Sequence, residues 1–142
     1  NRKQGAIPLP EQLERRAGAV SDAESAEFDL HWRQELLDQT WERLEARHVT
    51  AFRILRLKLA QPDMTSRELA ERYTAKHGEP MTSGNVRKSL ERAHRRFADL
   101  LVQELATQLT QPDRHQLRSE LRDLDLLKYC QSAVERWKPD AS

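Results

Sequence analysis

The sequence contains little cysteine and little glycine, and it has no long apolar run. Its 142 residues include one cysteine, Cys130, and four glycines. A lone cysteine cannot form a disulfide within its own chain, which is typical of proteins of a reducing compartment. No apolar segment approaches the roughly 20 residues of a membrane-spanning helix, and no signal peptide is seen. These absences predict a cytoplasmic protein without a membrane partner.

The residue patterns of common enzyme classes are also missing. There is no glycine-rich phosphate loop and no nucleophile turn of the Gly-x-Ser-x-Gly kind. The carboxylates are many, but they lie on charged helix faces, where solvation alone places them. The histidines do not have the spacing of zinc ligands; they are His31, His48, His77, His94 and His115. We therefore expect no enzyme, no catalytic residue, no metal and no cofactor.

The composition favours helices. Apolar residues make up 37% of the chain and charged residues 33%, and Ala, Leu, Glu, Arg and Gln are abundant. No alternating strand pattern of useful length occurs, and the chain is long enough for one domain with its own core. The predicted fold class is all-α, a helical domain with a helix-turn-helix and an additional C-terminal helix.

Proline and glycine divide the chain into three parts. Residues 1–27 carry Pro8, Pro10 and two glycines among mixed charges, and we interpret them as a linker or arm. Because the first residue is Asn and not Met, we expect a fragment or a processed product. A domain over residues 28–109 follows, with helices predicted over residues 28–47, 48–60 and 65–109, the last interrupted by a turn. A C-terminal extension over residues 110–142 is expected to hold one helix with leucines at positions 117, 121, 124 and 127, then a short tail with Tyr129, Val134 and Trp137.

Aromatic residues of the first predicted helix have two interpretations. Trp32 and Trp41 could stack on bases, but they share one helical stripe with Phe28 and several leucines. Core packing is the favoured interpretation for both tryptophans. Trp137 stays open, since it could contact the leucine stripe of the C-terminal helix or a partner protein.

A helix-turn-helix is predicted between Thr65 and Phe97. Thr65 and Glu68 are three residues apart, a spacing that can satisfy the first free amides of a helix. An apolar stripe follows on that helix, and His77-Gly78-Glu79-Pro80 ends it. The hydroxyls of the segment Thr82-Ser83-Gly84-Asn85 can then cap a second helix.

The second helix of this motif has an apolar and a basic face. Val86, Leu90, Ala93, Phe97 and Leu101 recur at helical spacing on one face. The opposite face carries Lys88, Arg92 and Arg95, flanked by Arg87, His94 and Arg96. Between residues 83 and 97 five Lys/Arg stand against one acid, a balance of +4, whereas the whole chain balances to +1. A face of one sign is typical of a surface that binds a phosphate backbone, although a merely solvated face is the alternative.

These segments resemble a known family. The segments Ser66–Ala70 and Gly84–Phe97 are similar to the C-terminal (region 4) domain of bacterial sigma-70 family RNA polymerase sigma factors, of a divergent extracytoplasmic-function (ECF) type. In that family a helix of the form Gly-Thr-Val-Lys-x-x-Leu-x-Arg-Ala-Arg-x-x-Leu follows a turn. The matching positions are Gly84, Val86, Leu90, Arg92 and Ala93, with conservative matches at Arg87 and Phe97.

The resemblance covers residues 28–105 and includes two departures. The helices predicted over residues 28–59 are similar to those that precede the family's motif, and residues 126–130 also resemble divergent members. About sixteen residues separate Ala70 from Val86, a longer turn than is usual in the family. His94 stands where the family usually has arginine.

The resemblance implies promoter recognition in transcription initiation. Such a domain binds the −35 element of duplex promoter DNA in the major groove and docks on the flap of the RNA polymerase core. An anti-sigma protein is a further implied partner. In this mode side chains at the front of the second helix contact base edges, and other cations contact phosphates. The candidates for groove contact are Ser83, Asn85, Lys88 and Arg92, and those for phosphate contact are Arg67, Arg87, Arg95 and Arg96.

Alternatives remain at this level. Asn85 and Arg92 are residue types that can bind adenine and guanine with two hydrogen bonds, but Asn85 could also have only a local role in the first helical turn. A dimeric repressor with a helix-turn-helix would share the basic helix. A helical protein-interaction module would use the C-terminal leucine stripe or the linker to bind its partner.

Overall fold

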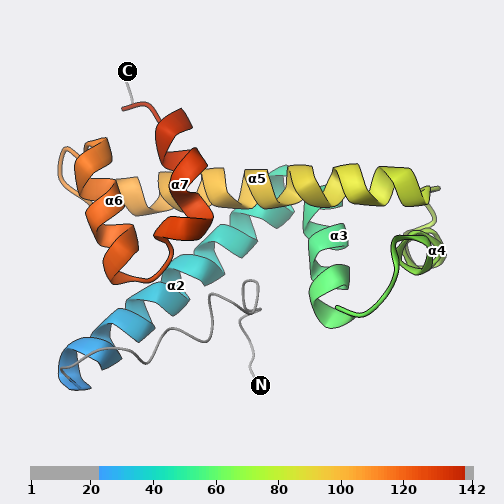
Figure 1. Cartoon of the computed structure of the whole chain (residues 1–142), viewed down its shortest axis with the longest axis horizontal. Coiled ribbons are helices and arrows are strands. Elements are labelled where there is room, and N and C mark those ends of the chain that lie inside the picture. The colour runs from blue at the N-terminus through green and yellow to red at the C-terminus, as the bar shows by residue number, and fades with distance from the viewer. Residues whose placement is uncertain (1–22, 140–142) are drawn as a thin grey trace. The chain divides into compact units, whose positions relative to one another are not determined.

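The computed structural model describes residues 23–139, and within this range it contains six α-helices and no strand (Figure 1). The helices are α2 (Ala23–Arg47), α3 (Val49–Ala60), α4 (Ser66–His77), α5 (Ser83–Thr107), α6 (Arg114–Asp123) and α7 (Leu127–Arg136). The all-α prediction is confirmed. Helix α2 begins five residues before the expected start at Phe28, so part of the expected arm is helical; residues 1–22 lie outside the described range.

The chain forms two compact units. One is continuous and runs over Trp41–Phe97; the other combines the described residues up to Thr40 with those from Ala98 onward. Helices α2 and α5 each contribute residues to both units, because α2 crosses the first boundary and α5 the second.

Aromatic side chains form the centre of the continuous unit. The ring of Trp41 lies 4.7 Å from that of Phe97 and 6.0 Å from that of Phe52, both in edge-on geometries, which aromatic pairs prefer. Trp41 and Phe97 are buried, as is Tyr73 of α4. These contacts join α2, α3 and α5, and they confirm the predicted core position of Trp41.

Trp32 and Phe28, the other aromatic residues of the predicted stripe, do not reach a core to the same extent. Trp32 is half-buried, and its indole Nε1 donates a hydrogen bond of 2.6 Å to Oε1 of Gln108. Phe28 is 66% exposed, so the apolar stripe extends beyond the packed core. Helical spacing places both residues on the same face as Leu36, but the packed part of that face begins only with the buried Arg33, whose Nε donates to the carbonyl of Leu124.

The C-terminal residues form two helices and not the single helix and short tail that the sequence predicted. Helices α6 and α7 lie side by side (Figure 1). Asp125 adopts a left-handed φ of 61°, and the amides of Asp125 and Leu126 donate to the carbonyls of Arg122 and Leu121. This is a Schellman helix end, closed by the fully buried Leu121 and Leu126. Asp occupies the position where glycine is the usual signal, which explains why the sequence did not reveal the break.

The buried faces of α6 and α7 provide the core of this unit. They carry Leu117, Leu121, Cys130, Ala133 and Val134. Burial, aided by the nearby Asp99 carboxylate, raises the pKa of the Cys130 thiol to about 12. Cys130 is therefore an inert apolar core residue, as its sequence context indicated.

Candidate nucleic-acid interface

The first half of α5 separates its apolar and basic side chains by face. Val86, Ala93 and Phe97 are fully buried, and Leu90 is half-buried. The exposed residues include Ser83, Asn85, Arg87, Lys88, Arg92 and Arg95 together with one acid, Glu91, and Arg96 is half-buried. We call Lys88, Arg92, Arg95 and their neighbours Arg87 and Arg96 the basic face.

Local hydrogen bonds fix both helices that lead to this face. At the start of α4 the Thr65 hydroxyl accepts from the Glu68 amide at 3.1 Å while the Glu68 carboxylate accepts from the Thr65 amide at 2.9 Å, a capping box. Helix α4 ends at Gly78, whose left-handed φ of 69° a residue with a side chain rarely adopts. The Thr82 hydroxyl then accepts from the Asn85 amide at 3.2 Å and caps α5. The capping functions predicted for Thr65 and Thr82 are confirmed.

The connection between α4 and α5, residues 78–82, is fixed by side chains on both sides. The Glu79 carboxylate accepts from the Tyr73 hydroxyl at 3.0 Å and lies 3.6 Å from the guanidinium of Arg53. The Met81 amide donates to the Thr74 hydroxyl at 3.1 Å. The unusual length between Ala70 and Val86 is therefore partly helix, since α4 continues to His77, and the remaining loop is anchored.

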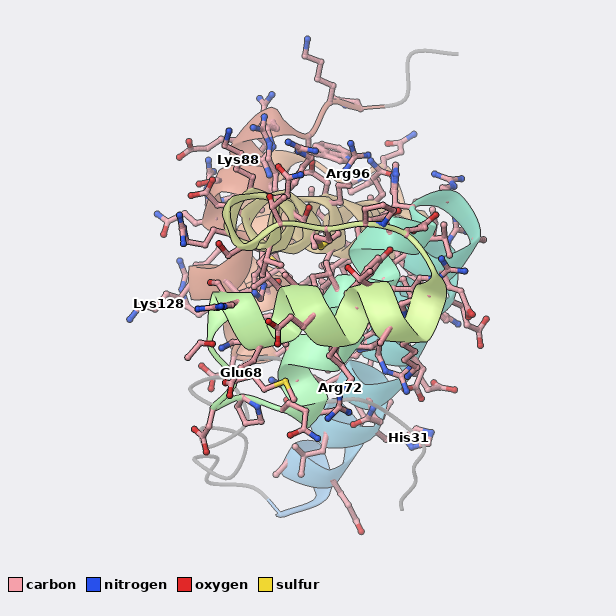
Figure 2. All side chains as sticks on the ribbon, turned by 90° about the vertical axis from the view of Figure 1, so that its right-hand side faces the viewer. His31, Glu68, Arg72, Lys88, Arg96 and Lys128 are labelled. Atoms are coloured by element: carbon pink, nitrogen blue, oxygen red, sulfur yellow. The ribbon has the colours of Figure 1, made fainter. Side chains whose placement is uncertain are left out.

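The structure brings seven of the eight candidate residues together on one helix. Ser83, Asn85, Arg87, Lys88, Arg92, Arg95 and Arg96 all belong to α5. Figure 2 shows Lys88 and Arg96 on the side of α5 that faces away from α4. Arg67 lies on α4 instead, where it pairs with Glu71 at 3.7 Å, one turn later. Both partners of this pair are highly exposed, so the pair contributes little to stability.

The basic face borders a cavity of about 320 Å³ that the sequence did not reveal. The cavity is lined by Ser89, Arg92 and Arg96 of α5, by Arg47 and His48 at the corner between α2 and α3, and by Val49, Thr50 and Ala51 of the first turn of α3. Nη1 of Arg96 donates to Nδ1 of His48 at 2.7 Å. Loss of hydration, followed by the charges of Arg96 and Arg47, lowers the pKa of His48, which keeps its ring neutral and able to accept this bond at neutral pH.

His94, the position where the resemblance expects arginine, does not belong to the basic face. Its side chain is half-buried, and burial lowers its pKa below the ordinary 6.5. At neutral pH the positive charge of this region thus comes from lysine and arginine alone.

A larger cavity of about 880 Å³ lies in the other unit. It is lined by the end of α5, by Gln111 and Pro112, and by residues 136–139. Trp137 is half-buried at its edge, and its carbonyl accepts from Arg114 at 2.9 Å. No acidic side chain lines it, and the titratable residues on its wall are Arg136 and Lys138. Arg136 is held by Asp99 at 2.6 Å.

Neither a metal site nor a membrane span is seen in the described range. Residues 23–139 contain no cluster of His, Cys, Asp and Glu able to hold a metal ion, and no helix in this range is long and apolar enough to cross a membrane. Compared with known proteins, the chain matches no family model, no curated protein and no solved structure.

Proposed function

We propose that the chain is the promoter-binding C-terminal domain of an ECF-type sigma factor, with a helix-turn-helix formed by α4 and α5. The observation that carries this proposal is the basic face of α5, which runs over residues 87–96, carries five Lys/Arg against the single acid Glu91, and is backed by the buried Val86, Ala93 and Phe97. Because both ends of the α4–α5 connection are capped, the face is presented on a rigid element. The resemblance of residues 66–70 and 84–97 to region 4 gives the proposal its specific form.

The proposed mechanism has two parts, electrostatic contacts with DNA phosphates and hydrogen bonds to base edges. The candidates for phosphate contact exchange counterions for DNA phosphates and so provide affinity without sequence preference; they are Arg67, Arg87, Arg95 and Arg96. The front of α5 enters the major groove of the −35 element, where Asn85 and Arg92 can each form two hydrogen bonds to a base edge. Ser83 and Lys88 lie at the same end of the helix. Docking on the polymerase flap positions the domain on the promoter, and an anti-sigma protein would compete for one of these surfaces.

The salt dependence of binding to duplex DNA tests the electrostatic part. Each cation that replaces a counterion contributes a slope of about −0.9 to log K against log salt. If the four candidates for phosphate contact, Arg67, Arg87, Arg95 and Arg96, each replace one counterion, the total slope is about −3.6. Fluorescence anisotropy with a labelled duplex measures it, and a slope near zero would rule out the nucleic-acid proposal in favour of a protein-interaction module.

A pull-down with the RNA polymerase core tests the sigma assignment. We expect the chain to bind core polymerase and to lose this binding when the flap is deleted. Equal binding to both forms, or none to either, contradicts the assignment even if DNA binding is found. Sedimentation measures the oligomeric state. A dimer that binds DNA without polymerase would indicate a repressor and not a sigma factor.

A further inference from the structure

The cavity beside the basic face has the composition of an anion site. Three arginines from two different elements converge on it: Arg47 at the end of α2, and Arg92 and Arg96 from α5. None of the eight lining residues is acidic, and two of them, Thr50 and Ser89, bring hydroxyls. Within the described range Arg47 and Arg92 have no acidic partner, so the charge around the cavity is not neutralised by the protein.

The first turn of α3 lines the remaining wall. Val49, Thr50 and Ala51 line the cavity and are the first three residues of the helix. No side chain among the described residues caps this turn, and it contains no acid. The amides of such a turn and the helix dipole favour an anion. Helix α4, by contrast, has its first amides satisfied by Thr65 and Glu68.

We infer that this cavity binds one phosphate group. A guanidinium offers parallel N–H donors that match two oxygens of a phosphate, and three of them with two hydroxyls exceed what a carboxylate can accept. The volume of about 320 Å³ leaves ample room for one phosphate group. His48 positions Arg96 through the 2.7 Å hydrogen bond.

The phosphate could belong to a nucleic-acid strand or to a small phosphomonoester, and the chemistry of recognition is the same. The inference is argued from the cavity and not from the proposed function, although it shares Arg92 and Arg96 with the residues proposed to contact DNA. If the phosphate is part of DNA, the cavity adds one backbone contact at the flank of α5, and Arg92 then contributes to phosphate contact as well as to the groove.

Inorganic phosphate is the first probe. We expect phosphate, titrated against chloride at equal ionic strength, to shift the backbone amide NMR signals of Val49, Thr50 and Ala51. Phosphate should also raise the melting temperature, since it binds the folded state and relieves repulsion between the arginines. No shift beyond that in chloride overturns the inference.

Two substitutions of the exposed Thr50 test whether the phosphate binds in this cavity. Thr50→Glu puts a carboxylate into the cavity and should weaken phosphate binding at least about tenfold, the loss of one charge-assisted contact. Its melting temperature should not fall, because an acid in the first turn favours the helix. Thr50→Gln matches the Glu variant in size, carries no charge and still offers N–H donors, so it should bind phosphate more tightly than Thr50→Glu. Equal binding by the Glu and Gln variants shows that the phosphate lies elsewhere and overturns the inference.

The substitution Arg47→Gln distinguishes a DNA phosphate from a free phosphate group as the natural ligand. Arg72→Gln on α4 is the control, because it removes one positive charge away from the cavity. Arg47→Gln should weaken inorganic phosphate binding severalfold, and Arg72→Gln should leave it unchanged. If Arg47→Gln also reduces the salt slope of duplex binding by about 0.9, the natural ligand is a DNA phosphate. If duplex binding is unaffected while phosphate binding falls, the site serves a free phosphate group. Unchanged phosphate binding in Arg47→Gln contradicts the inference, whatever the result with DNA.

Discussion

Replacing Arg95 with Ala should lower affinity for every duplex sequence by the same factor. Arg95 is exposed and lies opposite the buried Ala93 and Phe97, where phosphates and not base edges are the expected contacts. Loss of one phosphate contact reduces the salt slope by about 0.9. A fourfold rise in salt, from about 50 to about 200 mM, should therefore reduce the ratio of wild-type to variant DNA affinity by about 3.5-fold.

Replacing Arg92 should have a different signature. If its guanidinium binds a guanine edge, Arg92→Ala costs roughly 1–3 kcal/mol at one base pair, a factor of about 5 to 150, and relaxes the preference there. Arg92→Lys retains the charge and should keep the salt slope, but it loses the two parallel donors and with them most of the discrimination.

Anisotropy titrations with a set of duplexes that differ at single base pairs distinguish these outcomes. Lys128→Ala is the matched control, because Lys128 is an exposed cation on α7 whose loss changes the net charge equally. If Lys128→Ala weakens binding as much as Arg95→Ala, total charge and not the basic face of α5 determines affinity. If neither Arg92→Ala nor Arg95→Ala changes binding, the assignment of this face to DNA is refuted. A uniform loss with Arg92→Ala would move Arg92 from base contact to phosphate contact.

Three further predictions concern the unit that carries the basic face. Gly78→Ala should destabilise it by about 1 kcal/mol, because φ is 69° at this position. Gly84 lies at the start of α5 with open space around it, so Gly84→Ala should stabilise the unit by up to about 1 kcal/mol. Urea unfolding that shows the same sign for both substitutions would contradict this. Phe97→Ala should cost about 3–5 kcal/mol, since the ring is fully buried against Trp41, and thermal unfolding by circular dichroism checks it. Burial lowers the pKa of His94 in the folded chain, so just below pH 6.5 the unfolded chain binds more protons than the folded chain does. The contribution of neutral His94 to the free energy of unfolding is therefore complete above pH 6.5 and is lost as the pH falls below it. Urea unfolding at about pH 7.5 and about pH 5.5 should show this loss, and His94→Gln should reduce it.

The parts of the fold that could be predicted from sequence are those encoded by local chemistry. Thr65, Gly78 and Thr82 act within a few residues of their own position, so hydroxyl and glycine signals placed both ends of α4 and the start of α5. The break between α6 and α7 has equally local hydrogen bonds, but Asp125 takes the left-handed conformation there without a glycine or proline to mark it. Phe28 shows a second limit, since periodicity identifies a helix face but not where the partner helices stop covering it.

In the candidate site, the residues of a single helix could be grouped from the sequence, whereas residues from different helices could not. Helical spacing within α5 was enough to separate the basic side chains from Val86 and Phe97, because both sets belong to one helix. Arg47 and His48 could not be joined to Arg96 in this way, since they are more than forty residues away in sequence and come together with it only in the folded chain. The charge pattern has a related consequence. A net charge of +1 predicts weak and nearly salt-independent contact with DNA, whereas a local balance of +4 over residues 83–97, extended by Arg47 at the cavity, predicts a steep dependence. The measured slope therefore reports how charge is arranged on the folded surface, which no sum over the sequence contains.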